Sequence, residues 1–348
     1  MKAPIALCSS LVVGCTPLFS QYADSVSSAR GYFLQSYQYY QPMLADIRSP
    51  QFHMGVYWDE PVRFSNSTLS GKHAFWDVAF GGFFSLFGFT FEDRPVAHII
   101  DRTGIDFFID ASAHTLLDFN TLSSDVINTD FRFGAGVTSR LPDGFKHFSL
   151  RLRAFHESTH IGDEYALAAT RNASFRRYNV SYEAVDLYGA FDRYSPKCRV
   201  FFPDYFRFYA GARVLTGKAN FEDFSTLPEA RALTTSDRFE FQFGAEAFFF
   251  GCMPPSDVER KKESWIARLL LPQFFVLAGD YYCRDKYAVT DPEKVRSVNI
   301  VFGVMYGDYF QGKRTTRWTI NYYDGVNPHG QFRTDKISYW GLDFGVGF

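Results

Sequence analysis

The sequence lacks several features on which common protein classes depend. Beyond its N-terminus it contains no run of about 18 apolar residues, which excludes a helical membrane span there. Neither sign of charge dominates, with 36 basic and 38 acidic residues, so there is no basic footprint for nucleic acid. Only five cysteines occur, and their sparse, odd set fits neither a metal site nor a disulfide framework. Nucleic-acid-binding, helical membrane and disulfide-rich proteins are therefore excluded.

Aromatic residues, by contrast, are abundant. They make up 19% of the chain, with 40 Phe and 21 Tyr, a load that a soluble protein would have to hide from water. Many short segments alternate between apolar and polar residues. High aromatic content with such segments and no spanning helix is typical of a transmembrane β-barrel.

The N-terminus has the composition of an export signal. We predict that residues 1–21 form a signal peptide that is removed, because Ala3–Phe19 is mostly small or apolar. A second interpretation stays open, since the V-V-G-C sequence at residues 12–15 resembles a lipobox and would make the protein an exported lipoprotein anchored through Cys15. Residues 22–51 are rich in Ser, Gln and Tyr, and we expect them to form a periplasmic N-terminal segment.

From residue 52 onward the alternation has the period of two that β-strands require. Arg238–Phe249 is the clearest case, because phenylalanines occupy one face and Arg, Glu and Gln the other. In a soluble sandwich the polar face would be outside. In an outer-membrane barrel the apolar face contacts lipid and the charged face lines the lumen. The alternation alone does not distinguish these two folds.

The last strand favours the barrel. Ile337–Phe348 has apolar residues at every second position and ends on an aromatic residue, which resembles the C-terminal insertion signal of outer-membrane barrels. We therefore expect the barrel assembly machinery to act on the strand that ends in Phe348. The fold is predicted to be all-β, a single-domain antiparallel transmembrane β-barrel of about 12 strands over residues 52–348. The twelve expected strands are 52–58, 75–91, 105–114, 131–137, 148–158, 178–188, 206–214, 239–249, 269–282, 297–309, 317–323 and 337–348.

One stretch carries candidate chemistry. In Phe148–Glu164 the apolar face of the strand continues, at the same parity, into His156, Ser158 and His160. Histidine and serine at i and i+2 can serve as general base and nucleophile if a third group orients the imidazole. We take Asn172 as the candidate third group. Alternatively, the polar residues simply mark the rim of the membrane, because the apolar band of a barrel is only about 25 Å tall.

The His-x-Ser pattern resembles outer-membrane lipid hydrolases of the phospholipase A and lipid A deacylase types. Those enzymes carry His-x-Ser on a barrel strand and an Asn or Glu on the next strand. The resemblance implies Ser158 as nucleophile and His156 as base, and leaves the third position open between Asn172 and, more weakly, Glu164. It implies outer-membrane lipids as partners.

Two further clusters are candidates for binding or for structure. His160, Asp163 and Glu164, at the end of the same strand, are candidate ligands of a divalent cation such as calcium; otherwise no cofactor is expected. A second set is expected to line the lumen and to fill a narrow barrel with ion pairs rather than to bind a substrate. Its members are Arg132, Arg151, Arg153 and Glu183.

Longer motifs resemble one family of uncharacterised bacterial proteins, the domain-of-unknown-function family numbered 1207. The pieces occur in order along most of the chain. They are V-I-N-T-D-F (Val126–Phe131), F-H-E-S-T-H-I-G-D-E-Y (Phe155–Tyr165), Y-N-V-S-Y-E-A-V (Tyr178–Val185) and Y-Y-D-G-V-N-P-H-G-Q-F (Tyr322–Phe332). H-x-S-x-H-x-G-D-E is the most specific element. The resemblance implies an exported barrel and no particular activity.

Taken together, these features predict an integral protein of the bacterial outer membrane. Three roles stay open: a structural, binding or narrow-pore barrel; a lipid esterase or deacylase that uses Ser158 and His156; and a lipoprotein anchored through Cys15. No nucleic acid is expected as a partner.

Overall fold

The protein is described here from a computed structural model. The described residues are 30–34, 38–59, 74–92, 98–119, 125–163, 166, 178–195, 202–223, 238–249, 272–286, 293–307, 309–312 and 314–347. The expected signal peptide, Cys15, Asn172, Glu164 and Phe348 lie outside them. No helix in this part of the chain is long and apolar enough to span a membrane.

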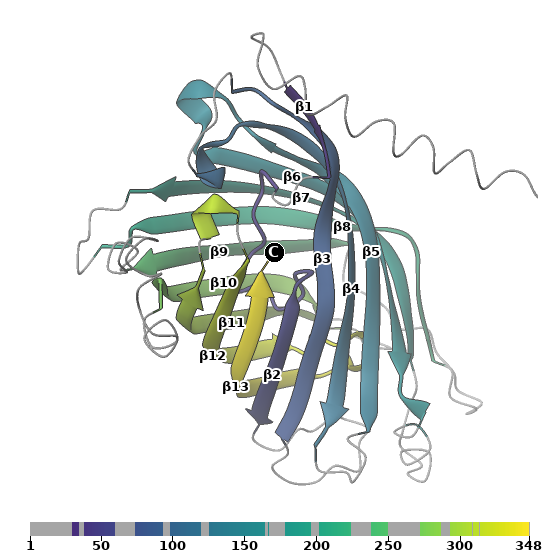
Figure 1. Cartoon of the computed structure of the whole chain (residues 1–348). Coiled ribbons are helices and arrows are strands. Elements are labelled where there is room, and N and C mark those ends of the chain that lie inside the picture. Colours follow the sequence, from purple (N-terminus) through teal and green to yellow (C-terminus); the bar gives the residue numbers. More distant parts are fainter. Residues whose placement is uncertain are drawn as a thin grey trace, which may run out of the picture.

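Twelve antiparallel strands close into a barrel (Figure 1). Each pairs with its neighbours in sequence, and β13 pairs with β2 to close the ring. The prediction of a 12-stranded antiparallel barrel is confirmed. The strands are β2 (Phe52–Asp59), β3 (Ala74–Thr90), β4 (Gly104–Asp118), β5 (Val126–Arg140), β6 (Phe148–Ile161), β7 (Tyr178–Tyr194), β8 (Tyr205–Asp223), β9 (Phe239–Phe249), β10 (Phe274–Lys286), β11 (Glu293–Tyr306), β12 (Thr315–Val326) and β13 (Lys336–Gly347).

Smaller elements decorate the ring. A thirteenth strand, β1 (Arg30–Phe33), pairs with the C-terminal end of β3, whereas β2 pairs with the N-terminal end of β3. Four short 3-10 helices lie in the described connections, and three of them, η1, η3 and η4, contain buried side chains. Their bounds are η1 (Ile99–Asp101), η2 (Asp143–Phe145), η3 (Tyr309–Gln311) and η4 (Gly330–Phe332).

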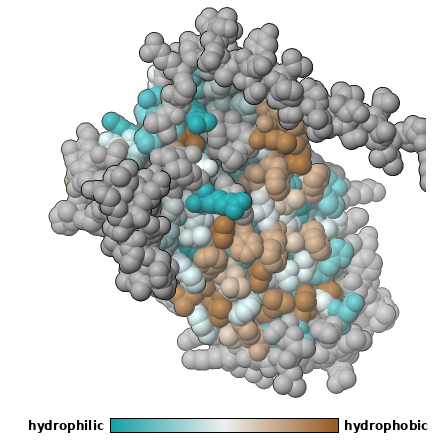
Figure 2. Space-filling model, viewed as in Figure 1, coloured by the Kyte–Doolittle hydropathy of each residue, from teal (hydrophilic) through white to brown (hydrophobic). Residues whose placement is uncertain are grey.

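The wall of the barrel is apolar outside and charged inside. On β6, Leu150 and Leu152 are 43% and 49% exposed, whereas Arg151 and Arg153 between and beside them are 2% and 1% exposed. Apolar side chains cover much of the visible outer wall over β2, β3 and β13 (Figure 2). This distribution is the reverse of that in a soluble protein and is the one expected when lipid surrounds the barrel.

Part of the N-terminal segment lies inside the barrel. We expected residues 22–51 to form a periplasmic segment, but the residues from Gln38 to Gln51 run through the interior (Figure 1). Wall arginines donate hydrogen bonds to the backbone carbonyls of this segment: Arg140 to Tyr39 (3.2 Å) and Arg207 to Gln41 (2.7 Å). An irregular chain can be buried only if its backbone polar groups find partners, and the inward-facing charges supply them.

The connection between β12 and β13 enters the interior from the opposite end. The backbone N–H of Gly330 donates to Asp130 on β5 (3.1 Å), and Arg333 pairs with Glu240 on β9. Phe332 joins a buried apolar cluster with Phe75 and Leu116. The lumen is therefore occupied by the segment 38–51 and by this connection.

Candidate functional site

A histidine and a glutamate meet on the outer wall. His156 of β6 and Glu183 of β7 are directly opposite in the strand register, and His156 Nδ1 lies 3.1 Å from Glu183 Oε1. Their side chains are 47% and 55% exposed. Ser158 lies two residues further along β6 on the same face and is partly exposed. The three side chains thus form one polar group on a wall that is otherwise apolar.

The position of Glu183 corrects the expectation that it belongs to the lumen cluster. Along β7 it shares its outward parity with Val185 and Leu187, which are 37% and 57% exposed, whereas Asp186 is buried. The expectation followed the rule that charged residues line the lumen. Strand parity decides instead, and the imidazole of His156 on the next strand gives the carboxylate a polar partner in its outward position.

Two lateral rows of outward side chains cross the wall from β3 to β7. Each row is defined by residues that are directly opposite one another in consecutive strand pairs. The first row is Gly82, Ala111, Phe133, His156 and Glu183. The second row is Phe80, Ala113, Phe131, Ser158 and Ser181.

An apolar groove follows these rows. Its volume is about 660 Å³, and its lining includes His156 and Ser158 at one end. Small residues such as Gly82 and Ala111 form the floor. A Cβ added at Gly82 would meet nothing within 4 Å, so the space above this residue is open. Exposed aromatic rings stand around that floor, and the groove is therefore apolar enough to hold a hydrocarbon chain. These rings are Phe80, Phe84, Phe131 and Phe133.

Between Ser158 and His156, both of which the structure describes, no hydrogen bond is recorded. Residues i and i+2 of a strand are about 7 Å apart along the strand axis, so the hydroxyl reaches the imidazole only after rotation of the side chains. Catalytic hydrogen bonds are often long until substrate binds. The ring nitrogen that faces Glu183 is Nδ1, which leaves Nε2 as the atom available to Ser158.

The remaining candidate residues have different positions. Asn172 and Glu164 lie outside the described residues. His160 is exposed, and its ring packs edge-on against Phe131 with centroids 5.7 Å apart, while Asp163 is exposed just beyond the end of β6. The expected cation cluster is therefore described only in part.

The arginines of the expected lumen cluster face inward and are paired. Arg132 Nε donates to Glu157 (2.9 Å), and Arg153 binds Asp110 (2.8 Å) and Asp186 (3.0 Å). Arg151 lies 3.5 Å from Asp186.

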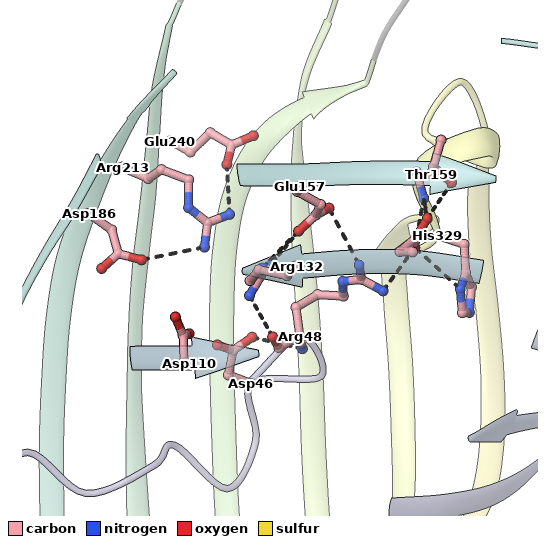
Figure 3. A network of polar contacts seen from close by, with 12 residues as sticks. Asp46, Arg48, Asp110, Arg132, Glu157, Thr159, Asp186, Arg213, Glu240 and His329 are labelled. Atoms are coloured by element: carbon pink, nitrogen blue, oxygen red, sulfur yellow. Dashed lines mark hydrogen bonds and ion pairs between the residues drawn. The ribbon is translucent and has the colours of Figure 1, made fainter. Parts of the chain in front are cut away.

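Arg48 of the N-terminal segment adds to this network. It binds Asp130 (3.0 Å) and Glu157 (3.4 Å) (Figure 3). The network ties the wall to the segment that fills the lumen.

Glu183 was not predicted as the partner of His156. The sequence does indicate its outward position, because Glu183 has the parity of Val185 and Leu187 on the strand that follows the His-x-Ser strand. The groove could not be read from one strand. It depends on the register of β3, β4 and β5, which brings Gly82 and Ala111 into one row.

Fold and wall together define a transmembrane β-barrel protein with a polar group on its lipid-facing surface. The chain belongs to the family described as "Protein of unknown function (DUF1207)", which it matches over residues 22–204, more than half of its length. No curated protein matches the chain.

Among solved structures, one that is similar is the crystal structure of the transport unit of the autotransporter AIDA-I from Escherichia coli. Its sequence is 10% identical, the TM-score is 0.38, and the match covers 88% of this chain and 92% of that chain. A similarity this distant says nothing about the activity of the present chain.

Proposed function

We propose that the protein is an outer-membrane hydrolase of lipid esters, with Ser158 as nucleophile, His156 as general base and Glu183 as the group that orients the imidazole. The observation that carries the proposal is the His156–Glu183 contact of 3.1 Å on the outer wall, with Ser158 beside it at the end of an apolar groove. Its location would be a bacterial outer membrane, because a barrel with this apolar wall requires lipid around it.

The reaction would proceed in two steps. Ser158 Oγ attacks the ester carbonyl carbon and passes its proton to His156, which then protonates the leaving alcohol oxygen as the carbon–oxygen bond breaks. Water, deprotonated by His156, attacks the resulting acyl-serine and releases the fatty acid. The carboxylate of Glu183 holds the imidazole by Nδ1 and stabilises its positive charge during both transfers.

The groove indicates the substrate class. Its aromatic walls and small floor match an acyl chain, while the polar group at its end matches the ester linkage. A lipid in the surrounding leaflet would reach the groove sideways, without leaving the membrane. Membrane phospholipids and acylated glycolipids such as lipid A are therefore the substrates to test.

The filled lumen favours this role over a pore. Gln38–Gln51 and the β12–β13 connection occupy the interior, and their hydrogen bonds run to wall residues on both sides. A cavity of about 300 Å³ lies between that segment, β3 and the start of β12.

The test is an assay of the purified protein in detergent micelles and in bilayers against phospholipid and lipid A esters, with and without calcium. Wild type should release fatty acid, and Ser158→Ala should reduce turnover by several powers of ten, as the loss of a nucleophile does. Ser181→Ala, on the neighbouring strand in the same lateral row, is the matched control and should retain activity. Equal turnover by wild type and Ser158→Ala, or none by wild type, would leave the polar residues as part of the membrane rim.

A further inference from the structure

The inner wall carries a group of potential metal ligands that the proposed hydrolase does not use. His53 of β2, Asp77 of β3 and His114 of β4 are all buried, and each offers one ligand atom such that the three atoms lie within 4.8 Å of one another. The strand register brings them together. Ala79 lies opposite both His53 and His114, and its small side chain lets the two imidazoles approach each other.

The distances between the side chains are short but do not satisfy their polar atoms. His53 Nε2 is 3.7 Å from Asp77 Oδ1, which is too long for a hydrogen bond, and the ring centroids of His53 and His114 are 5.9 Å apart. Both ring nitrogens of His53 and both of His114 have no hydrogen-bond partner among the described residues. Asp77 Oδ1 likewise has no hydrogen-bond partner among the described residues.

Such a group is costly unless something binds it. Burial of polar atoms without partners is unfavourable, and here one ligand atom from each of the three residues lies within 4.8 Å of the others. Two imidazoles and a carboxylate are ligands that a divalent transition metal ion takes, with Zn²⁺ the most common example. In a tetrahedral site ligand atoms are roughly 3.3 Å apart, given metal–ligand distances of about 2.0–2.1 Å. Side-chain rotations that move the ligand atoms by about an ångström would bring them from the present spacing, within 4.8 Å, to the tetrahedral spacing.

We propose that His53, Asp77 and His114 bind a divalent transition metal ion inside the barrel, with Zn²⁺ as the reference ion. The site would join three consecutive strands at the inner wall, separate from the lipid-facing residues. It does not depend on the proposed hydrolase activity.

His329 would position the carboxylate of this site. It comes from the β12–β13 connection, and its Nε2 lies 3.7 Å from Asp77 Oδ2, on the oxygen that faces away from His53. Its Nδ1 lies 3.7 Å from Asp130 Oδ2, so the imidazole stands between two acids. At 3.7 Å neither contact is a hydrogen bond. A small movement of the imidazole on metal binding would let it donate to Asp77, and partners that hold a ligating carboxylate raise the affinity for metal. The connection that enters the lumen would thus be linked to the metal through Asp77.

The experiment measures metal binding directly. Full-length protein without a histidine tag is purified in detergent, treated with a chelator and titrated with Zn²⁺ by calorimetry, and Co²⁺ is used as a second probe because its visible spectrum reports coordination by nitrogen and oxygen. Wild type should bind one ion per chain, and metal should raise its resistance to denaturant. His53→Gln, His114→Gln and Asp77→Asn should each weaken binding at least tenfold.

His147→Gln is the matched control, because His147 precedes β6 and its Nδ1 lies 3.0 Å from the carbonyl oxygen of Asp192, away from the inner-wall ligands. It should bind metal as wild type does. A separate variant, His160→Gln, tests the cation cluster expected at the end of β6. Migration in gels with and without heating shows that each variant is folded. Absence of saturable binding to folded wild type would overturn the proposal, as would equal binding by wild type and folded His114→Gln. Binding that is lost only in His160→Gln would place the metal outside the barrel and overturn it as well.

Discussion

His156 Nδ1 and Glu183 Oε1 face each other at 3.1 Å across β6 and β7, on the side of the wall where nearly every other residue is apolar. An exposed ion pair contributes little to stability in water, about 0–1 kcal/mol, and two polar groups are costly at a lipid-facing position. Stability therefore does not explain this pair; in the proposed hydrolase, Glu183 would orient the imidazole of His156.

We predict that Glu183→Gln lowers kcat for ester hydrolysis by up to about 10⁴-fold, the loss seen when the acid of a triad becomes an amide. The amide keeps the size of the side chain and can hold the imidazole in the wrong tautomer. Fatty-acid release under saturating lipid measures the effect. Glu293→Gln is the control, because Glu293 is exposed and pairs only with Lys336, at 3.7 Å. A fall in both variants alike would show that loss of surface charge, and not orientation of His156, is responsible.

Filling the groove should change the preference for chain length. Gly82→Phe places a ring over the groove floor, where an added Cβ meets no atom within 4 Å. Long-chain esters should lose at least tenfold in kcat/KM, while a short-chain ester should be hydrolysed at nearly the wild-type rate. Gly279→Phe is the matched control, since Gly279 of β10 also has open space around an added Cβ. Unchanged preference in Gly82→Phe would show that acyl chains bind elsewhere.

Removal of Arg48 should destabilise the barrel. Arg48 is buried between Asp130 (3.0 Å) and Glu157 (3.4 Å), and Arg48→Ala would leave these acids with too little positive charge. Breaking a buried ion pair in this way costs about 3–5 kcal/mol. Denaturant unfolding, followed by the shift between folded and unfolded migration, measures the change.

Lys146→Ala removes an exposed partner of Asp101 (3.5 Å) and serves as the control for that experiment. It should change the free energy of unfolding by less than about 1 kcal/mol. If both variants unfolded at the same denaturant concentration, the N-terminal segment would contribute nothing to stability through Arg48.

Ion conductance should be low in the wild type. Residues 38–51 are held by hydrogen bonds from Arg140, Arg207 and Asn299 on three different strands. A planar bilayer containing the wild-type protein should show no steady current. Deletion of residues 38–50 should produce steps of conductance, and high steady conductance by the wild type would contradict a filled lumen.

Much of the fold follows from the sequence because strand periodicity is a local property. The alternation of Phe and charged residues in β9 and the outward series that ends at Phe344 predict both the strands and their two faces. The count of twelve follows from the same pattern. The prediction extended β10 back to Leu269, whereas the strand begins at Phe274.

The candidate site was predictable only where a single strand defines it. His156 and Ser158 share one strand and one face, so their proximity follows from parity. Glu183, the groove floor and the three inner-wall ligands depend on pairing between strands, which no local pattern fixes. The same is true of the N-terminal segment, whose partners Arg132, Arg140 and Arg207 lie about 84 to 166 residues away along the chain.

The path of that segment has a consequence for assembly. It directly precedes β2, and β2 is the strand on which β13 closes the ring. The segment that fills the lumen is therefore covalently attached to β2, one of the two strands that close the barrel. It need not be threaded into a barrel that has already closed. Its carbonyls meet their side-chain donors, the arginines of β5 and β8 and Asn299 of β11, only as the wall curls from β5 toward β11. The barrel wall would then form around residues 38–51, and the pairing of β2 with β13 would be the last contact to form.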